Sequence, residues 1–477
     1  MLSILSLLSF IGLSPVGYFA NVIGTTEPAL KLLISIIASY PQAIIFEKYF
    51  KNEGIAKRNL FFILTGVDMA FYNFGLSLYH NVIPAIVLMA STKILGPGQK
   101  NAIWTSAFNM LYLVAGYIMT ESEDYDITWT MPQCVLTLKL IALSFDLWDG
   151  QRKPEELSKN NKETALTYAP RFLELIGFVF FPPCFLVGPM FSFKRYHTFI
   201  SGGYPLDRDT SYGSYAFKRL AQGFFFLTAF QIGVTVFDNQ YMLTEDFRET
   251  SIFYRHFYCG LWAHFALYKY ISCWLLTEAA CIRYGFSYNA RAEKEDEKWN
   301  GCTNILLMRF ESATRFQHYI ESFNCNTNYF AAEYVYKRLK FLGNRNLSQV
   351  LTLFFLAVWH GTQSGYYATF FNEFIIMVME KDLEPLLVRT KLYHKVWEHP
   401  AGKVFLYIVL KTYTIVFMGW SLVPISFKTF PRWWQVYQSL WFSGFILFLP
   451  WAFVYKPLVI KLIKPLELVE GAPKKYN

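Results

Sequence analysis

His360 is the residue whose type and place in the sequence most clearly suggest chemistry. It lies near the midpoint of residues 350–371, a run without Asp, Glu, Lys or Arg. A helix of about 20 residues is roughly 30 Å long and crosses the apolar core of a bilayer. An ionisable side chain at that depth is costly unless it faces protein or water. His360 is therefore a candidate functional residue, and its imidazole could act as a general base near neutral pH.

A continuous helix through residues 350–371 predicts a polar surface beside the histidine. Gln363, Ser364 and Tyr367 follow His360 at spacings of three, four and seven residues, which place them on one helix face. Such a polar stripe is expected on one wall of a hydrated cavity. The alternative is a buried histidine that only donates to a backbone carbonyl.

An asparagine cluster precedes the histidine run. Asn324, Asn326, Thr327 and Asn328 lie within residues 322–329. Clusters of this kind are usually turns or helix caps. An amide can also polarise a carbonyl, and a histidine base together with such an amide could catalyse acyl transfer. The local pattern leaves both interpretations open.

A basic run lies between the asparagine cluster and the histidine. It comprises Lys337, Arg338, Lys340 and Arg345. These side chains could meet phosphate groups at the membrane surface. The positive-inside rule offers the alternative that they merely flank a membrane segment on its cytosolic side.

Three acidic residues stand inside apolar segments or at their ends. Asp146 and Asp149 lie at the end of a segment that begins near residue 132, where they could bind substrate or pair with a lysine. Glu278 lies within residues 252–284 and could pair with Lys269 or another base. The candidate substrate-binding residues are thus Asp146, Asp149, Glu278, Trp359, Gln363 and Ser364.

The composition assigns the chain to the membrane proteins. Of 477 residues, 54% are hydrophobic and 17% are charged, whereas soluble domains carry about 25% charged residues. The net charge of +9 fits cytosolic loops rich in Lys and Arg and gives no reason to expect nucleic-acid binding. The seven cysteines include no CxxC pair, so neither a disulfide framework nor a zinc site is expected.

Apolar segments recur along the chain and predict an all-α polytopic protein with about eleven transmembrane helices. The segments cover residues 2–20, 29–47, 60–78, 82–96, 101–119, 132–148, 167–191, 218–238, 252–284, 350–371, 403–426 and 437–459. Pro182 and Pro183 should break the helix in the seventh segment, because neither has a backbone N–H. Residues 303–346 are too charged for a simple span and predict short, interfacial or re-entrant helices.

Residues 322–361 resemble the signature region of the membrane-bound O-acyltransferase family. Four further stretches share this likeness, which extends from about residue 90 to about residue 425; they are residues 136–150, 185–193, 241–247 and 267–282. The resemblance implies a helical fold that encloses a reaction chamber inside the membrane. It places the family's catalytic histidine on His360, between Trp359 and Gly361, and its catalytic asparagine on Asn324.

Members of this family transfer an acyl group from acyl-CoA to a hydroxyl. In the branch that the chain resembles, the acceptor is the sn-2 hydroxyl of a lysophospholipid. The resemblance implies lysophosphatidylcholine first, then the ethanolamine and serine analogues, and a preference for polyunsaturated chains in phospholipid remodelling. It also implies acyl-CoA as a co-substrate, which the basic run could face, and no permanently bound cofactor or metal.

The resemblance assigns proton abstraction to His360. Asn324 would orient the thioester or stabilise the oxyanion. Phe323 and Phe330 stand where the family often has tryptophan, a difference that bears on the shape of the accepted acyl chain.

Three alternatives remain at this point. Another branch of the family would acylate a sterol, diacylglycerol or a protein, but would lack the likeness at residues 136–150 and 267–282. A proton-coupled transporter could use His360 and the broken helices, but transporters commonly show paired repeats, and none is visible. A membrane scaffold would leave the polar residues around His360 unexplained.

The C-terminal residues suggest a cellular address. Lys474 and Lys475 match a di-lysine retrieval signal, which cytosolic coat-protein machinery reads on endoplasmic reticulum membrane proteins. This predicts a multi-pass protein of that membrane with a cytosolic C-terminus, the alternative being a merely basic terminus. We expect one membrane-embedded acyltransferase domain, residues 1–465, and a tail, residues 466–477. Family members often form dimers, so a homodimer is a further expectation.

Overall fold

Helices make up the regular structure of the described chain, as the sequence predicts. The computed structural model describes residues 15–121, 127–204 and 211–463, and these contain no β-strand. Much of the first predicted segment and the tail with Lys474 and Lys475 lie outside the described residues.

Several helical segments of the described chain are long and apolar enough to cross a membrane, which confirms the polytopic prediction. They are Glu27–Phe50, Ile55–Leu95, Gln99–Thr120, Thr130–Asp149, Tyr212–Leu243, Pro400–Phe427 and Ser443–Ile463. The expected number of about eleven spans stays a prediction.

The chain divides into two units, each of which is described by itself. Unit 1 comprises Met1–Leu227, Tyr270–Ile305 and Asn324–Ser348, and unit 2 comprises Thr228–Lys269, Leu306–Phe323 and Gln349–Asn477. The chain passes from one unit to the other within α12 (Ser211–Val236), α14 (Ile252–Tyr284) and α18 (Arg345–His360).

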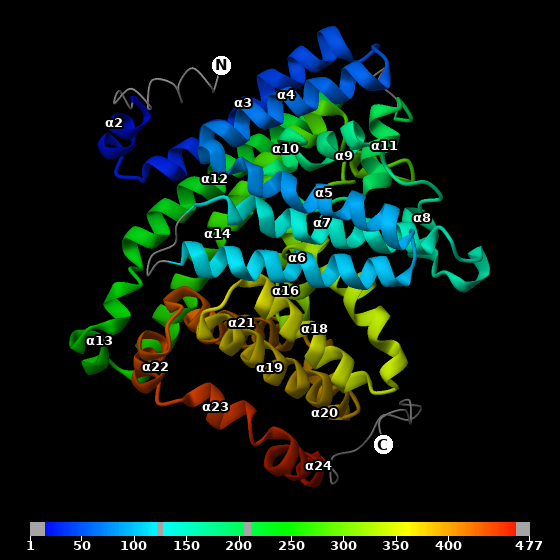
Figure 1. Ribbon diagram of the computed structural model, residues 1–477. Coiled ribbons are helices and arrows are strands. Elements are labelled where there is room, and N and C mark those ends of the chain that lie inside the picture. The colour runs from blue at the N-terminus through cyan, green and yellow to red at the C-terminus, as the bar shows by residue number, and fades with distance from the viewer. Residues whose placement is uncertain (1–14, 122–126, 205–210, 464–477) are drawn as a thin grey trace. The chain divides into compact units, whose positions relative to one another are not determined.

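Unit 1 contains most of the helices drawn in blue, cyan and green (Figure 1). Besides parts of α12, α14 and α18, its elements are α2 (Pro15–Val22), α3 (Glu27–Ile45), η1 (Phe46–Phe50), α4 (Ile55–Phe74), η2 (Gly75–Leu78), α5 (Tyr79–Leu95), α6 (Gln99–Thr120), α7 (Thr130–Asp149), η3 (Pro154–Glu156), α8 (Lys159–Thr164), α9 (Phe172–Val179), α10 (Pro182–Phe185), α11 (Phe193–Ile200), η5 (Glu295–Glu297), α17 (Cys325–Phe330), η6 (Ala331–Tyr336) and η7 (Lys337–Leu342).

Unit 2 holds the remaining described elements. Besides parts of α12, α14 and α18, they are η4 (Gln240–Leu243), α13 (Glu245–Glu249), α15 (Leu307–Glu311), α16 (Phe316–Ser322), α19 (Ser364–Val388), α20 (Lys391–Glu398), α21 (Pro400–Phe427), α22 (Phe430–Ser439), α23 (Ser443–Phe448), η8 (Trp451–Tyr455) and α24 (Lys456–Ile463).

α7 is the central helix of unit 1. It packs against α5 and α6, and nearly all of its side chains are buried, including those of Lys139, Asp146 and Asp149. A helix that is enclosed on all sides has no need of an amphipathic pattern. The Lys139 ammonium donates to the carbonyl oxygen of Phe178 at 2.6 Å, which helps to satisfy a cation in an apolar interior.

Aromatic rings fill the core of each unit. In unit 1, the ring centroids of Phe62 and Phe181 lie 5.0 Å apart, and Tyr284 packs 6.0 Å from Phe181. In unit 2, the buried ring of Trp420 stacks on Tyr437 at 5.3 Å. Large rings bury much apolar area per residue, which explains part of the high aromatic content of the chain.

Two local predictions about the backbone are confirmed. α9 ends at Val179 and the short α10 begins at Pro182, because two consecutive residues without an N–H cannot continue a helix. Between residues 303 and 346, α15, α16, α17, η6 and η7 are all short. Their expected interfacial or re-entrant position stays a prediction.

The predicted continuous helix over residues 350–371 is wrong. α18 ends at His360 and α19 begins at Ser364. The break occurs at Gly361, whose φ of +151° is rarely adopted by residues with a side chain. Gln363 and Ser364 therefore do not continue a polar stripe on the helix that carries His360. The apolar composition indicated the length of the run but not the backbone conformation of Gly361.

Candidate functional site

His360 is the last residue of α18, and its imidazole has one defined hydrogen bond. The ring atom Nδ1 lies 2.7 Å from the carbonyl oxygen of Leu356, one helical turn earlier. A carbonyl oxygen only accepts, so Nδ1 carries the hydrogen and Nε2 has a free lone pair in the neutral ring. Within the described chain, Nε2 has no hydrogen-bond partner.

Both interpretations of His360 thus apply to the same ring. The histidine does donate to a backbone carbonyl, as the non-catalytic alternative requires. The same bond holds the second nitrogen ready to accept a proton, as a general base requires.

Aromatic side chains surround the imidazole within unit 2. The ring centroid of Trp359 lies 4.5 Å from that of His360 in an edge-on arrangement, and those of Phe370 and Tyr366 lie at 5.1 and 6.0 Å. A Cβ on Gly361 would lie only 2.5 Å from the ring of Tyr366. The absence of a Cβ on Gly361 therefore allows this ring to pack closely against the end of α18.

The two polar candidates after the break belong to the start of α19. Gln363 occupies the N-cap position of that helix. The Ser364 hydroxyl lies 3.3 Å from the carbonyl oxygen of Lys428, to which it donates, and it accepts from the indole N–H of Trp433 at 3.1 Å. Ser364 thus ties α19 to the segment around α22, and a substrate-binding role for it stays a prediction.

Asn324 has an uncommon backbone conformation within unit 1. Its φ and ψ are 50° and 47°, in the left-handed region, where asparagine and aspartate are the most frequent residue types after glycine. It stands at the N-cap position of α17, yet its side chain makes no capping hydrogen bond. Instead, its Oδ1 accepts from Nδ2 of Asn304 at 3.1 Å. The cap interpretation is therefore correct for the position of Asn324 but not for its side chain.

Glu278 supports the segment that contacts Asn324. Its buried Oε1 accepts from the backbone N–H of Asn304 at 2.6 Å and from that of Ile305 at 3.3 Å. Its Oε2 lies 3.5 Å from Nε of Arg219. The expected base partner of Glu278 within unit 1 is thus Arg219, and its carboxylate connects α12 and α14 to the loop before α15.

Asp149 is the partner of one residue of the basic run. Its carboxylate is fully buried and accepts two hydrogen bonds from Arg338, one of them, between Nη1 and Oδ1, at 2.9 Å. Arg152 lies 3.6 Å from the same carboxylate. Such a paired guanidinium and carboxylate is a strong, directional contact. It joins η7 to the end of α7.

Asp146 accepts a hydrogen bond from a tyrosine that the sequence did not single out. The Tyr334 hydroxyl donates to Oδ1 of Asp146 at 2.8 Å. Burial, and then the nearby Asp146 carboxylate, raise the pKa of Tyr334 well above its ordinary value, so the phenol stays a donor. The other carboxylate oxygen, Oδ2, is buried without a partner among the described residues.

The rest of the basic run divides into a paired residue and two exposed ones. Lys337 forms an ion pair with Glu333. Lys340 and Arg345 are exposed. A CoA-facing role for the run stays a prediction, and these two exposed cations are the members with charge open to solvent.

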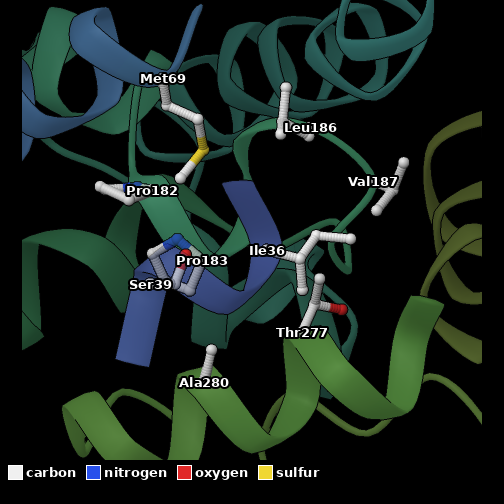
Figure 2. A pocket seen from close by; sticks show the side chains of 9 residues that line it. All are labelled: Ile36, Ser39, Met69, Pro182, Pro183, Leu186, Val187, Thr277 and Ala280. Carbon is white, nitrogen blue, oxygen red and sulfur yellow. The ribbon is translucent and has the colours of Figure 1, made fainter. Parts of the chain in front are cut away.

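Unit 1 also contains a small apolar pocket between α3, α10 and α14 (Figure 2). Its lining side chains leave almost no room for a water molecule, whereas most small-molecule sites enclose roughly 300–1,000 Å³. The hydroxyls of Ser39 and Thr277 that line it bond to carbonyl oxygens of their own helices. The pocket therefore presents little that could orient a polar ligand.

Sequence reasoning missed Asn304, Arg219 and Tyr334. Each acts through a partner distant in the sequence. Asn304 and Arg219 stand outside the stretches that resemble the family, and Tyr334 lies within residues 322–361 but is one of many aromatic residues there. Asn304 lies at the start of the mixed segment 303–346, where a polar residue has no distinguishing pattern. No group of three His, Cys, Asp or Glu side chains in the described ranges is placed to hold a metal ion.

The chain is similar over most of its length to known proteins. The model of the membrane-bound O-acyltransferase family matches residues 114–423. A protein of Drosophila melanogaster named lysophospholipid acyltransferase 5 is 40% identical over 451 residues, which cover 91% of this chain and 88% of that protein. Proteins of the same name from Homo sapiens and Caenorhabditis elegans are 38% and 31% identical, covering 94% and 93% of this chain and 92% and 95% of theirs.

Proposed function

The chain belongs to the membrane-bound O-acyltransferase family and is a multi-pass membrane acyltransferase, and we propose that it acylates lysophospholipids with acyl-CoA as the donor. The acceptor is the free sn-2 hydroxyl, with lysophosphatidylcholine first and the ethanolamine and serine analogues next. The acyl chains are preferentially polyunsaturated, and the reaction serves phospholipid remodelling. The names and high coverage of the relatives support this choice over a sterol, diacylglycerol or protein acceptor.

His360 is the proposed general base, and its defined tautomer is the observation that carries this role. Nδ1 is committed to the Leu356 carbonyl, so Nε2 takes the proton of the acceptor hydroxyl as the oxygen attacks the thioester carbon. The tetrahedral intermediate then releases CoA as a thiolate, which recovers the proton from the imidazolium. An acyl-enzyme is unnecessary because the thiolate is a good leaving group.

Asn324 is the proposed partner for the thioester oxygen. Its NH₂ group is available to donate, because its Oδ1 already accepts from Asn304. A donor aimed at the developing oxyanion typically contributes about 10²–10³ in kcat. Asparagine adopts the left-handed conformation of Asn324 more readily than most other residues with a side chain, so this backbone is compatible with the proposed role.

Location and assembly are further parts of the proposal. We place the protein in the endoplasmic reticulum membrane with a cytosolic C-terminus, where coat-protein machinery reads Lys474 and Lys475. The acyltransferase domain is residues 1–465, and Lys340 and Arg345 attract the CoA phosphates from the cytosol. We also propose that Trp359 and Gln363 contact the substrate. The family's tendency to dimerise supports a homodimer.

The direct test is transfer by the purified full chain in lipid nanodiscs. Mixed acyl-CoAs are supplied with lysophosphatidylcholine, and parallel reactions contain cholesterol, diacylglycerol or an acceptor peptide. Phospholipid product and released CoA thiol are measured by mass spectrometry and by a thiol reagent. We expect acylated product with lysophospholipid alone; transfer to another acceptor in its place would refute the proposed substrate class.

Variants of the two proposed catalytic residues complete the test. His360→Ala should abolish transfer, and Asn324→Ala should reduce it at least about 100-fold, in folded protein. His256→Ala is a matched control, because His256 also bonds through Nδ1 to a carbonyl one turn earlier, at 2.8 Å, but its Nε2 is bonded to Ser443. Normal turnover in His360→Ala would exclude the general-base mechanism.

A further inference from the structure

Asn304 uses all of its polar groups in hydrogen bonds within unit 1. Its backbone N–H donates to Glu278 at 2.6 Å, and its carbonyl oxygen accepts from the N–H of Cys325 at 3.0 Å. In the side chain, Oδ1 accepts from the backbone N–H of Asn326 at 3.0 Å, and Nδ2 donates to Asn324 at 3.1 Å. The residue is almost completely buried, so water cannot replace these partners.

These bonds fix which end of each amide is the donor. A backbone N–H can only donate, so the Asn304 atom opposite the N–H of Asn326 must be the oxygen. The other terminal atom of Asn304 is therefore the nitrogen, which donates to Asn324. The Asn324 atom that it meets must be Oδ1. The free end of the Asn324 side chain is consequently its NH₂ group, which has no hydrogen-bond partner in the described part of the chain.

We infer that Asn304 is a positioning residue that locks the Asn324 amide with its NH₂ group toward the substrate. Asn324 then acts as a donor to the thioester oxygen and the oxyanion, and its carbonyl does not face the reacting group. This inference rests on the proposed function, in which Asn324 touches the thioester. It decides between the two roles that the sequence leaves open for Asn324.

Glu278 and Arg219 hold Asn304 in place. The Glu278 carboxylate accepts from two successive backbone N–H groups at Asn304 and Ile305, and Arg219 lies beside its second oxygen. Carboxylate acceptors make stronger hydrogen bonds than neutral ones. Polar contacts thus run without a gap from Arg219 through Glu278 and Asn304 to Asn324, the proposed oxyanion donor.

The test is the substitution Asn304→Asp, which replaces the side-chain NH₂ donor of residue 304 with an acceptor oxygen. The aspartate can still accept from the N–H of Asn326, but its second oxygen cannot donate to Asn324. The Asn324 amide must then rotate by half a turn and present its carbonyl oxygen to the substrate. We expect kcat for acylation of lysophosphatidylcholine to fall about 100-fold, with KM for acyl-CoA changed less than about twofold.

Asn289→Asp is the matched control. Asn289 also accepts from a backbone N–H, that of Arg291, at 3.0 Å and donates through Nδ2 to another asparagine, Asn300, at 2.8 Å. The same substitution there should leave kcat within about twofold of the unaltered protein. The folded fraction of each variant is measured by gel filtration and thermal melting, so kcat refers to folded protein.

The outcomes separate this inference from the proposed function. Wild-type kcat in folded Asn304→Asp, with Asn324→Ala inactive, overturns the inference and leaves the function intact. Absence of transfer in the unaltered chain overturns both. If Asn304→Asp does not fold, Asn304→Ser replaces it: its hydroxyl is too short to reach Asn324, and kcat should fall about tenfold. An unchanged kcat in folded Asn304→Ser also overturns the inference.

Discussion

Arg338 offers a sharp test of whether the basic run stabilises the fold or binds CoA. Its partner Asp149 is fully buried, and Arg338 itself is only 14% exposed. Arg338→Gln would remove the guanidinium that makes two hydrogen bonds to this carboxylate. Breaking a buried ion pair from one side typically costs about 3–5 kcal/mol. Arg152, at 3.6 Å, offers partial compensation, so we expect the lower end, about 3 kcal/mol.

The loss of stability in Arg338→Gln should lower the melting temperature of the protein. Unfolding entropy is about 2.1 cal/mol/K per residue, which gives about 1 kcal/mol/K for a chain of 477 residues. A loss of about 3 kcal/mol therefore lowers the melting temperature by about 3 °C. The assay is a fluorescence melt of the purified protein in one detergent, alongside kcat and KM for acyl-CoA.

Two further variants make the Arg338 result interpretable. Lys340→Gln removes an exposed cation of the same run and should change the melting temperature by less than about 1 °C. The double variant Arg338→Gln, Asp149→Asn removes both charges and should recover much of the lost stability. An unchanged melting temperature in Arg338→Gln, together with a raised KM for acyl-CoA, would refute the structural role and favour direct contact with CoA.

Two other substitutions probe the supports of the candidate site. Gly361→Ala would require a strained φ and place a Cβ 2.5 Å from the ring of Tyr366. The resulting displacement of His360 should lower kcat at least about tenfold. Gly213→Ala is the control, because a Cβ there meets no atom within 4 Å; equal rates in the two variants would contradict this reasoning. Glu278→Ala leaves two buried N–H groups without their acceptor and should lower the free energy of unfolding by about 2–4 kcal/mol, measured by thermal melting. Glu278→Gln keeps an acceptor oxygen and should recover most of this loss; equal melting temperatures for both variants would argue against these hydrogen bonds.

The sequence was sufficient wherever a property depends on nearby residues. The predicted segment 252–284 coincides with α14 (Ile252–Tyr284), because a long apolar run with few breakers favours one helix. The adjacent prolines located the end of α9, since they remove backbone donors wherever they occur. The all-α membrane class followed from composition. The same local view placed His360 in an apolar run and Asn324 in a polar turn.

Local pattern failed where a single residue changes the backbone path. Apolar content over residues 350–371 predicted one span, but Gly361 ends α18 directly after His360. A glycine is compatible both with a helix and with the positive φ found here. The packing of Tyr366 over this position depends on the folded chain and leaves no signal in the hydropathy of the run.

What the sequence by itself determined is the class of the protein, the places of long helices such as α14, and the two residue types suited to acyl transfer. The tertiary structure decided which polar groups meet. It paired Arg338 with Asp149, joined Tyr334 to Asp146, and set Asn304 against Asn324. The physical reason is that a hydrogen bond needs a donor and an acceptor within about 3 Å. Sequence spacing cannot give that distance for residues brought together only by the fold.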